Sequence, residues 1–361
     1  MLQYIYMEHS LKPSSDCRRR YIYIDTLNII SIIAVLFLHH NGGVHYFGRS
    51  SNWVTSLIAE TVFYFAVPLF VMITGTTLLG YRQKYDTKTY FKKRFLKVLI
   101  PSIAWMLIMF CWHVFIRKDL TITNWSPSGI INIFTSSQEN TVYYYLFVIL
   151  GLYLTIPLFA PLADKKYRKL LWYGVGAFFV FNALLPNLSK LVGISYNNDL
   201  SLQIGSYVVY IFLGHLLSTA KIPKKYRVLL YLGGVLAIIW RYTTTLNASF
   251  AHGYLIKTTW GYTQFHTIIL ASAVYVFVKN LPLDKISERA KTVLAKLASC
   301  SFGIYLCHIL VMYYEGGILK RIGVPTASWI YRFLCPFLTY ALCVGLVLIL
   351  KKIPFVRRIV P

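Results

Sequence analysis

The 361-residue chain is poor in charged residues and poorest in acidic ones. Only 14% of its residues are charged and only 12 are Asp or Glu, whereas an ordinary soluble domain is about 25% charged. Gly-rich phosphate loops and HExxH, CxxC and GxSxG motifs are absent from the sequence, which excludes the usual signatures of ATPases, metalloproteases and α/β-hydrolases. Six cysteines are too few for a disulfide scaffold. The chain is therefore neither a soluble globule nor a disulfide-stabilised domain.

What the sequence has instead is long hydrophobic runs, which contribute to a hydrophobic content of 57%. A bilayer core of about 30 Å needs roughly 20 mostly apolar residues per helix. Ten runs approach that length, at about 21–40, 54–81, 98–116, 142–163, 170–186, 203–219, 228–240, 264–278, 302–314 and 329–350. The sequence therefore predicts an all-α fold, a polytopic membrane bundle of about ten helices.

The basic residues indicate how this bundle is oriented. The chain has 37 Lys and Arg and a net charge of +25, which in a soluble protein would suggest a nucleic-acid partner. Sorting the connecting segments alternately places 28 basic residues on one side and 8 on the other, with Arg332 inside the last predicted span. Because cytoplasmic loops are enriched in Lys and Arg, we predict a multi-pass protein of the cell membrane with both termini cytoplasmic and no nucleic-acid partner.

The domain organisation follows from the spans. We expect a basic cytoplasmic segment at residues 1–20, a single transmembrane domain at 21–350 and a short cytoplasmic tail at 351–361. No stretch between spans exceeds roughly thirty residues, which is too short to bury a core of its own. Function must then come from the bundle and its loops.

Ionisable residues inside spans are costly, so each is a candidate for function. Asp25, Asn28 and His39 lie on nearly one face of the first predicted helix, because eleven residues are close to three turns. His40 points about 100° away from that face. A hydrogen-bonded histidine at the membrane interface is the alternative interpretation of His39.

Glu60 lies seven residues inside the interfacial Trp53 on the second predicted span. This places it at a depth similar to that of His39, where a carboxylate would fix the imidazole tautomer and raise its basicity. A carboxylate in an apolar helix needs a partner. A purely structural ion pair and a protonated, hydrogen-bonded carboxyl are the alternatives to a catalytic role for Glu60.

The ninth predicted span carries Ser301, Tyr305 and His308 at i, i+4 and i+7, sharing a face with Glu315. The spacing identifies Tyr305 and His308 as supporting residues of a site. A packed interface between helices explains the same pattern without chemistry.

A basic segment follows the second predicted span and includes Lys93, Arg94 and Lys97, shortly before Pro101. Arg and Lys are the usual partners of phosphate groups, so these three residues could bind a phosphorylated cofactor. Positive-inside topology and contact with anionic membrane lipids explain the segment equally well.

Several segments, in this order, resemble the acyltransferase family 3 of integral membrane acyltransferases. The stretch from Ile24-Asp25-Thr26-Leu27-Asn28 to Leu38-His39 is similar to the family's opening helix. Further similarities are Val67-Pro68-Leu69-Phe70 with Thr74-Gly75, the basic loop from Lys93-Arg94 to Pro101, Tyr144-Tyr145-Leu146, Gly151-Leu152-Tyr153-Leu154-Thr155-Ile156-Pro157, and Ser301-Phe302-Gly303-Ile304-Tyr305-Leu306-Cys307-His308.

The resemblance implies that the transmembrane domain is acyltransferase-3-like, that His39 is the essential histidine, and that acetyl-CoA or another acyl-CoA is the cytoplasmic donor, with no metal. It implies an acceptor at the outer face, a surface glycan or lipid-linked sugar, with glycan-synthesis proteins as candidate partners. Two positions depart from the family. Many members have Arg where this chain has Asn28, and their paired loop arginines are matched here by Arg94 and Lys97.

Three functions compete at this point. In the first, the chain is an O-acyltransferase in which Arg94 and Lys97 bind the phosphates of CoA and His39 acts either as general base or as a transiently acylated nucleophile. In the second, it transports a glycan or lipid intermediate, although the internal repeats typical of transporters are not evident. In the third, it is a binding or sensory membrane module.

Overall fold

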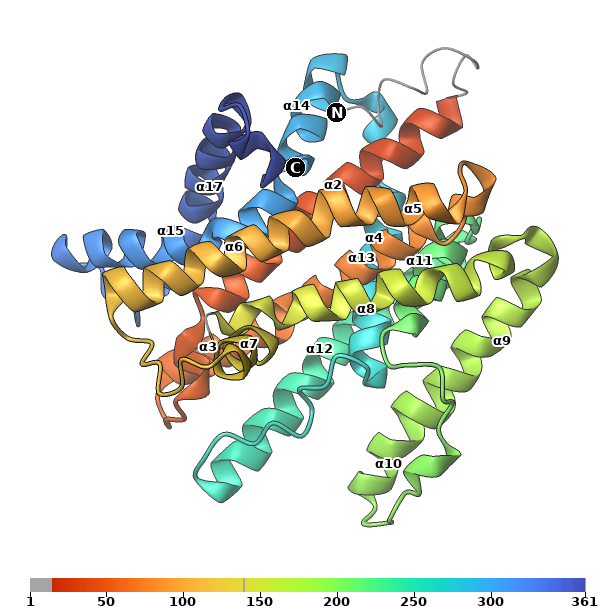
Figure 1. Ribbon diagram of the computed structural model, residues 1–361. Coiled ribbons are helices and arrows are strands. Elements are labelled where there is room, and N and C mark those ends of the chain that lie inside the picture. The colour runs from red at the N-terminus through yellow and green to blue at the C-terminus, as the bar shows by residue number, and fades with distance from the viewer. Residues whose placement is uncertain (1–14, 139, 361) are drawn as a thin grey trace.

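The computed structural model describes residues 15–138 and 140–360 (Figure 1). Every regular element in that part of the chain is helical. Of the predicted N-terminal segment 1–20, residues 1–14 lie outside the described residues. Residues 15–20 form the start of the first described helix, α2. The principal helices are α2 (Ser15–His39), α3 (Ser51–Phe63), α4 (Ala66–Leu78), α5 (Thr87–Arg94), α6 (Ile100–Cys111), α7 (Pro127–Thr135), α8 (Tyr144–Phe159), α9 (Arg168–Phe178), α10 (Leu185–Leu191), α11 (Val208–Thr219), α12 (Lys224–His252), α13 (Phe265–Lys279), α14 (Glu288–Ala298), α15 (Ser301–Arg321), α16 (Trp329–Phe333) and α17 (Cys335–Lys352).

The predicted polytopic helical bundle is confirmed. Among the described residues, 9 helical stretches are long and apolar enough to cross a membrane, and the 12-residue α11 occupies the position of the remaining predicted span. The nine are Ile22–His39, Ser51–Gln83, Thr87–Arg117, Thr141–Ala163, Lys165–Lys190, Lys224–His252, Phe265–Lys285, Ser301–Arg321 and Cys335–Lys352.

Two helices are longer than the sequence predicts. The seventh predicted span, 228–240, is part of the 29-residue α12, and the ninth, 302–314, is part of the 21-residue α15. A helix continues past a polar side chain because its backbone hydrogen bonds do not depend on side-chain polarity. Arg241, which the hydropathy pattern assigns to an outer loop, is therefore a buried residue of α12.

The last predicted span, 329–350, is broken near its start. Arg332 belongs to the short α16, and α17 begins at Cys335. Pro336 lacks a backbone N–H and cannot bond to the turn before it, so the two helices do not join into one. Arg332 consequently lies beside the last spanning helix and donates to Asn52 Oδ1 at 3.0 Å.

The helix α2 lies inside the bundle, in contact with α3, α4, α13, α14, α15 and α17, while α9 and α10 lie at one margin (Figure 1). Beside it, α4 and α11 approach each other backbone to backbone. A Cβ built on Gly75 would lie 2.1 Å from the Ile211 carbonyl oxygen, and one on Gly214 would lie 1.9 Å from that of Met72. Small residues of this kind allow close packing of membrane helices, where the hydrophobic effect between helices is absent.

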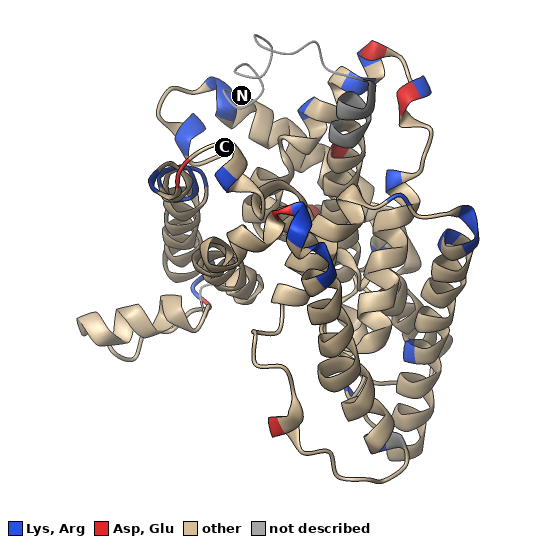
Figure 2. Cartoon of the chain, turned by 90° about the vertical axis from the view of Figure 1, so that its right-hand side faces the viewer, with Lys and Arg blue, Asp and Glu red and all other residues tan. Residues whose placement is uncertain are grey.

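The basic residues gather toward the end of the molecule that holds both marked termini (Figure 2). We expect this end to be cytoplasmic. In a cysteine-free background, single cysteines at the exposed positions Ser50 and Asn197 should react with a membrane-impermeant reagent added outside, and one at the exposed Lys285 should not. Labelling of Ser50 and Asn197 only after the membrane is opened would contradict the predicted orientation.

Candidate functional site

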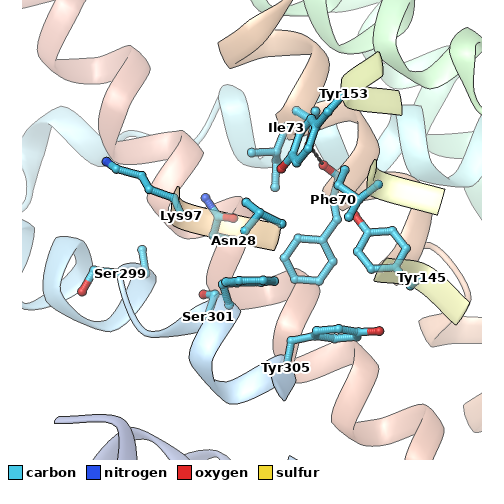
Figure 3. Close-up of a pocket in the computed structure, with 14 residues that line it drawn as sticks. Asn28, Phe70, Ile73, Lys97, Tyr145, Tyr153, Ser299, Ser301 and Tyr305 are labelled. Atoms are coloured by element: carbon cyan, nitrogen blue, oxygen red, sulfur yellow. Dashed lines mark hydrogen bonds between the residues drawn. The ribbon is translucent and has the colours of Figure 1, made fainter. Parts of the chain in front are cut away.

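A cavity of about 280 Å³ opens between α2, α4, α8 and α15 (Figure 3). We call it the inner cavity, and it is lined by Asn28, Phe70, Ile73, Thr74, Lys97, Val98, Tyr145, Ile149, Tyr153, Ala298, Ser299, Ser301, Phe302 and Tyr305. Tyr145 and Tyr153 are eight residues apart on α8, which corresponds to about 12 Å along the helix. The inner cavity is thus deep and mostly apolar with a few polar groups, as small-molecule sites usually are.

Two of those polar groups belong to residues on the predicted polar faces. Asn28 shares a helix face with His39, and Ser301 shares one with Tyr305 and His308. Asn28 Nδ2 donates to the Ile24 carbonyl at 3.1 Å, and its side chain contributes to the cavity wall. Ser301 Oγ is buried and has no hydrogen-bond partner among the described residues. A buried hydroxyl without a partner is costly. A ligand in the inner cavity would supply one.

The basic segment meets the inner cavity through Lys97. Residues Phe95–Leu99 form a π-helical turn, a local widening that redirects side chains and is common at functional sites. The Arg94 guanidinium lies 5.5 Å from the ring centre of Tyr153, another lining residue. Lys93 lies instead over Tyr85, at 3.8 Å from the ring centre. Of the three predicted cofactor-binding residues, Lys97 and Arg94 are therefore beside the inner cavity and Lys93 is directed elsewhere.

His39 lies beyond the deep end of the inner cavity. Its ring centre is 5.0 Å from that of His308, and His308 is 5.8 Å from Tyr305, which lines the cavity. His308 Nδ1 lies 2.7 Å from the Tyr305 carbonyl. Because a carbonyl only accepts, Nδ1 carries the proton, and the buried Nε2, which has no described partner, presents its lone pair. The structure thus brings the predicted residues His39, Tyr305 and His308 together.

His40, the neighbour of His39, belongs to a different network. Its Nε2 lies 3.0 Å from Thr339 Oγ1 and 3.9 Å from Glu315 Oε2, and Thr339 Oγ1 donates to Glu315 Oε2. Its Nδ1 bonds to the Leu36 carbonyl at 2.9 Å. This buried network ties α2 to α15 and α17. Glu315 therefore bonds within the His40 network, two turns along α15 from His308.

Glu60 does not pair with His39 as the depth argument expects. Its Oε1 lies 3.7 Å from a guanidinium nitrogen of Arg241, and Asn41 Nδ2 donates to its Oε2 at 3.4 Å. The carboxylate is buried, and Asn41 also donates to the Ser56 carbonyl at 2.8 Å. Helix packing has placed α12 against α3, so the cation that Glu60 requires comes from α12.

Asp25 is buried on α2, one turn before Asn28, and does not line the inner cavity. Its predicted supporting role remains a prediction. His, Cys, Asp and Glu side chains within residues 15–138 and 140–360 form no group of three able to hold a metal ion.

A second cavity of about 260 Å³, the outer cavity, is lined by Thr135, Ser136, Ser137, Thr141, Tyr144 and Phe147. It lies between α7 and the start of α8. Tyr144 lines the outer cavity and the next residue, Tyr145, lines the inner one. These consecutive residues of α8 therefore face different cavities.

Sequence reasoning missed Arg241 and the aromatic residues around it. The available signal was an arginine within an apolar run, which should be treated as an intramembrane ion by default. For Ser301, the sequence predicts only a position on the same helix face as Tyr305 and His308, and does not predict that its hydroxyl is buried beside a cavity.

Comparison with known proteins identifies a family but no relative. A family model described as an acyltransferase domain matches residues 21–348. No curated protein and no solved structure matches the chain.

Proposed function

Because the chain belongs to the acyltransferase domain family, we propose that this multi-pass membrane acyltransferase is an O-acyltransferase of the cell membrane. The donor is acyl-CoA, with acetyl-CoA as the proposed form, and the acceptor is a hydroxyl of a surface polysaccharide or lipid-linked sugar. One observation carries the proposal. The inner cavity runs from Lys97 to Tyr305 and ends one aromatic contact away from the His308–His39 pair.

The basic residues at the cavity suit the donor's phosphates. Lys97 lines the inner cavity and Arg94 lies near Tyr153 on the same wall, so both cations lie where a CoA head group would enter. Lys93, over Tyr85, is left out of the proposed donor site. The narrow pantetheine arm of CoA, which carries two amide groups, would then pass along Tyr153 and Tyr145 toward Tyr305.

The depth of the inner cavity answers a geometric problem. His39 is near the predicted outer end of α2, eleven residues or about 16 Å beyond Asn28, whereas acyl-CoA is cytoplasmic. A donor arm that reaches Tyr305 brings the thioester close to the His308–His39 pair. Transfer then needs no large movement of the helices.

In the direct route, His39 accepts the proton of the acceptor hydroxyl as its oxygen attacks the thioester carbonyl. The C–S bond breaks, the acyl group stays on the acceptor oxygen, and the CoA thiolate takes the proton from the imidazolium. In the two-step route, the neutral imidazole of His39 attacks the thioester carbonyl, the C–S bond breaks, and the leaving CoA thiolate takes the N–H proton of the acylated ring. The acceptor hydroxyl then attacks the acyl group, the C–N bond breaks, and the hydroxyl proton passes to the imidazole. Both routes use the same residues, and the inner cavity supports both.

Radiolabelled acetyl-CoA provides the test. We expect the purified protein in detergent to bind acetyl-CoA, and membranes containing it to move the labelled acetyl group into a base-labile ester of the glycan or glycolipid fraction. Membranes without the chain are the control. Absence of acetyl-CoA binding by protein that melts cooperatively would overturn the proposal and favour the transporter hypothesis.

A further inference from the structure

Beyond His39, the buried guanidinium of Arg241 is surrounded by Glu60, Tyr64 and Trp260. We call these four residues the Arg241 cluster. The Arg241 guanidinium lies 3.1 Å from the ring centre of Tyr64 and 5.4 Å from that of Trp260, and Tyr64 donates its hydroxyl proton to the Trp260 carbonyl. Arg241 is 2% exposed. Nothing in the donor half of the reaction uses these residues.

The cluster has hydrogen-bond donors in excess. All three guanidinium nitrogens of Arg241 and the indole nitrogen of Trp260 are buried and make no hydrogen bond of ordinary geometry within the described chain. Glu60 at 3.7 Å balances the charge but is too far for a hydrogen bond. Among the described residues, the five guanidinium N–H groups and the indole N–H therefore have only the Tyr64 hydroxyl and the Glu60 carboxylate as nearby acceptors, and neither is in ordinary hydrogen-bond geometry. Buried donors without acceptors are costly, and a charged one most of all.

The charges and rings around these donors favour an anion on a flat ligand. Lys257 Nζ lies 5.4 Å from the ring centre of Trp260, so two cations face the single carboxylate of Glu60. Burial, together with the nearby Lys257, lowers the pKa of His45, which keeps that residue neutral at pH 7. Tyr64 stacks on Tyr262 with ring centres 4.4 Å apart. Because Arg241 and Tyr262 cover the faces of Tyr64, the half-buried Trp260 is the ring that offers an apolar surface to a ring-shaped ligand.

The cluster extends inward from the surface on the predicted outer side. Lys257 is exposed, Trp260 is half-buried and Arg241 is buried. The side chain of Tyr262 interacts with Tyr144, which lines the outer cavity.

The cluster also lies next to His39. Helix α2 runs from Asn28 at the inner cavity to its end at His39, and the following turn leads to His45, whose ring centre is 5.7 Å from that of Trp260. Asn41, two residues after His39, bonds to Glu60. The Arg241 cluster therefore begins where the proposed donor path ends.

We infer that the Arg241 cluster binds an oxyanion carried by the acceptor sugar, either a carboxylate or a phosphate. The guanidinium of Arg241 and the indole N–H donate to the oxyanion oxygens, and the ring of Trp260 contacts the sugar face. The inference rests on the proposed function, since it assigns the acceptor half of the same site. It makes the preferred acceptor an acidic or phosphorylated sugar.

Calorimetry of probe binding to the purified protein tests the inference. The three probes are methyl β-D-glucuronide, glucose 1-phosphate and the neutral methyl β-D-glucoside. We expect at least one anionic probe to bind roughly tenfold more tightly than the glucoside. Preference for the glucuronide identifies a carboxylate as the recognised group, and preference for the sugar phosphate identifies a phosphate.

Arg241→Lys keeps the charge opposite Glu60 and removes the forked donors, and Trp260→Phe keeps the ring and removes the N–H. Each should weaken anionic-probe binding roughly tenfold, whereas Trp172→Phe, on the exposed part of α9, should not. All variants should retain the melting temperature and the acetyl-CoA affinity of the wild type. Equal binding of neutral and anionic probes, or unchanged binding by Arg241→Lys, would overturn the inference. Absence of acetyl-CoA binding by the wild type would instead overturn the proposed function. Failure of the inference and failure of the proposed function are therefore distinguishable.

Discussion

Replacing His39 with alanine is expected to reduce acyl transfer by at least about 100-fold, the contribution of a positioned general base, and by more if His39 carries the acyl group. The protein should remain folded. His39 is only half-buried and makes no hydrogen bond within the described chain, so its loss leaves no buried polar group unpaired. Transfer of labelled acetyl to the glycan fraction measures the effect, and acetyl-CoA affinity should stay near that of the wild type.

His40→Ala is the matched control, because it removes the same side chain one position away. His40 is 2% exposed and bonded to Leu36 and Thr339. Its loss leaves buried partners unsatisfied, at about 1–3 kcal/mol of folding free energy. We therefore expect a lower melting temperature, with transfer per folded molecule largely kept. A greater loss of transfer per folded molecule in His40→Ala than in His39→Ala would show that the wrong histidine has been assigned.

The second large effect concerns the donor. Charge-assisted hydrogen bonds to phosphate contribute about 1.5–3 kcal/mol each, and partial exposure to solvent reduces this. Arg94→Gln with Lys97→Gln should accordingly raise KM for acetyl-CoA by roughly 10- to 100-fold with a smaller effect on kcat. Steady-state kinetics at fixed ionic strength gives both constants.

The control for this pair is Lys88→Gln with Lys92→Gln. It removes two positive charges from the same segment, at exposed positions that do not line the inner cavity. Its KM should change little, which separates contact with the donor from general electrostatic attraction. An equal rise of KM in both double variants would refute the assignment of Arg94 and Lys97 while leaving the acyltransferase proposal intact.

The sequence predicts well whatever depends on one helix alone. The spacing of Asn28 and His39 is fixed by helical periodicity, and the structure places the first at the inner cavity and the second against His308. Tyr305 and His308 are neighbours for the same reason, since i and i+3 positions share a face. Hydropathy likewise locates the apolar helices, because the bilayer sets their length.

Contacts between helices are less predictable, because packing decides them. Equal depth suggests that Glu60 meets His39, but depth is one coordinate, and rotation about the helix axis directs Glu60 toward Arg241 on α12. The direction of the Lys93 side chain relative to Lys97 cannot be predicted from helical spacing for a similar reason. The π-helical turn at Phe95–Leu99 changes the helical phase, and no periodicity rule anticipates it.

The arrangement of Tyr144 and Tyr145 has an electrical consequence. Since these neighbours face different cavities, aqueous space on both sides would leave only a thin septum, about the diameter of one helix, to insulate the membrane. A membrane voltage then falls mainly across that septum, where one elementary charge changes in energy by about 2.3 kcal/mol per 100 mV. A neutral acyl group crosses this field at no electrostatic cost, whereas the proton that passes from the acceptor hydroxyl to the CoA thiolate carries a charge through it. Under the proposed orientation, the membrane voltage would thus act on the protons of the reaction and leave the acyl group unaffected.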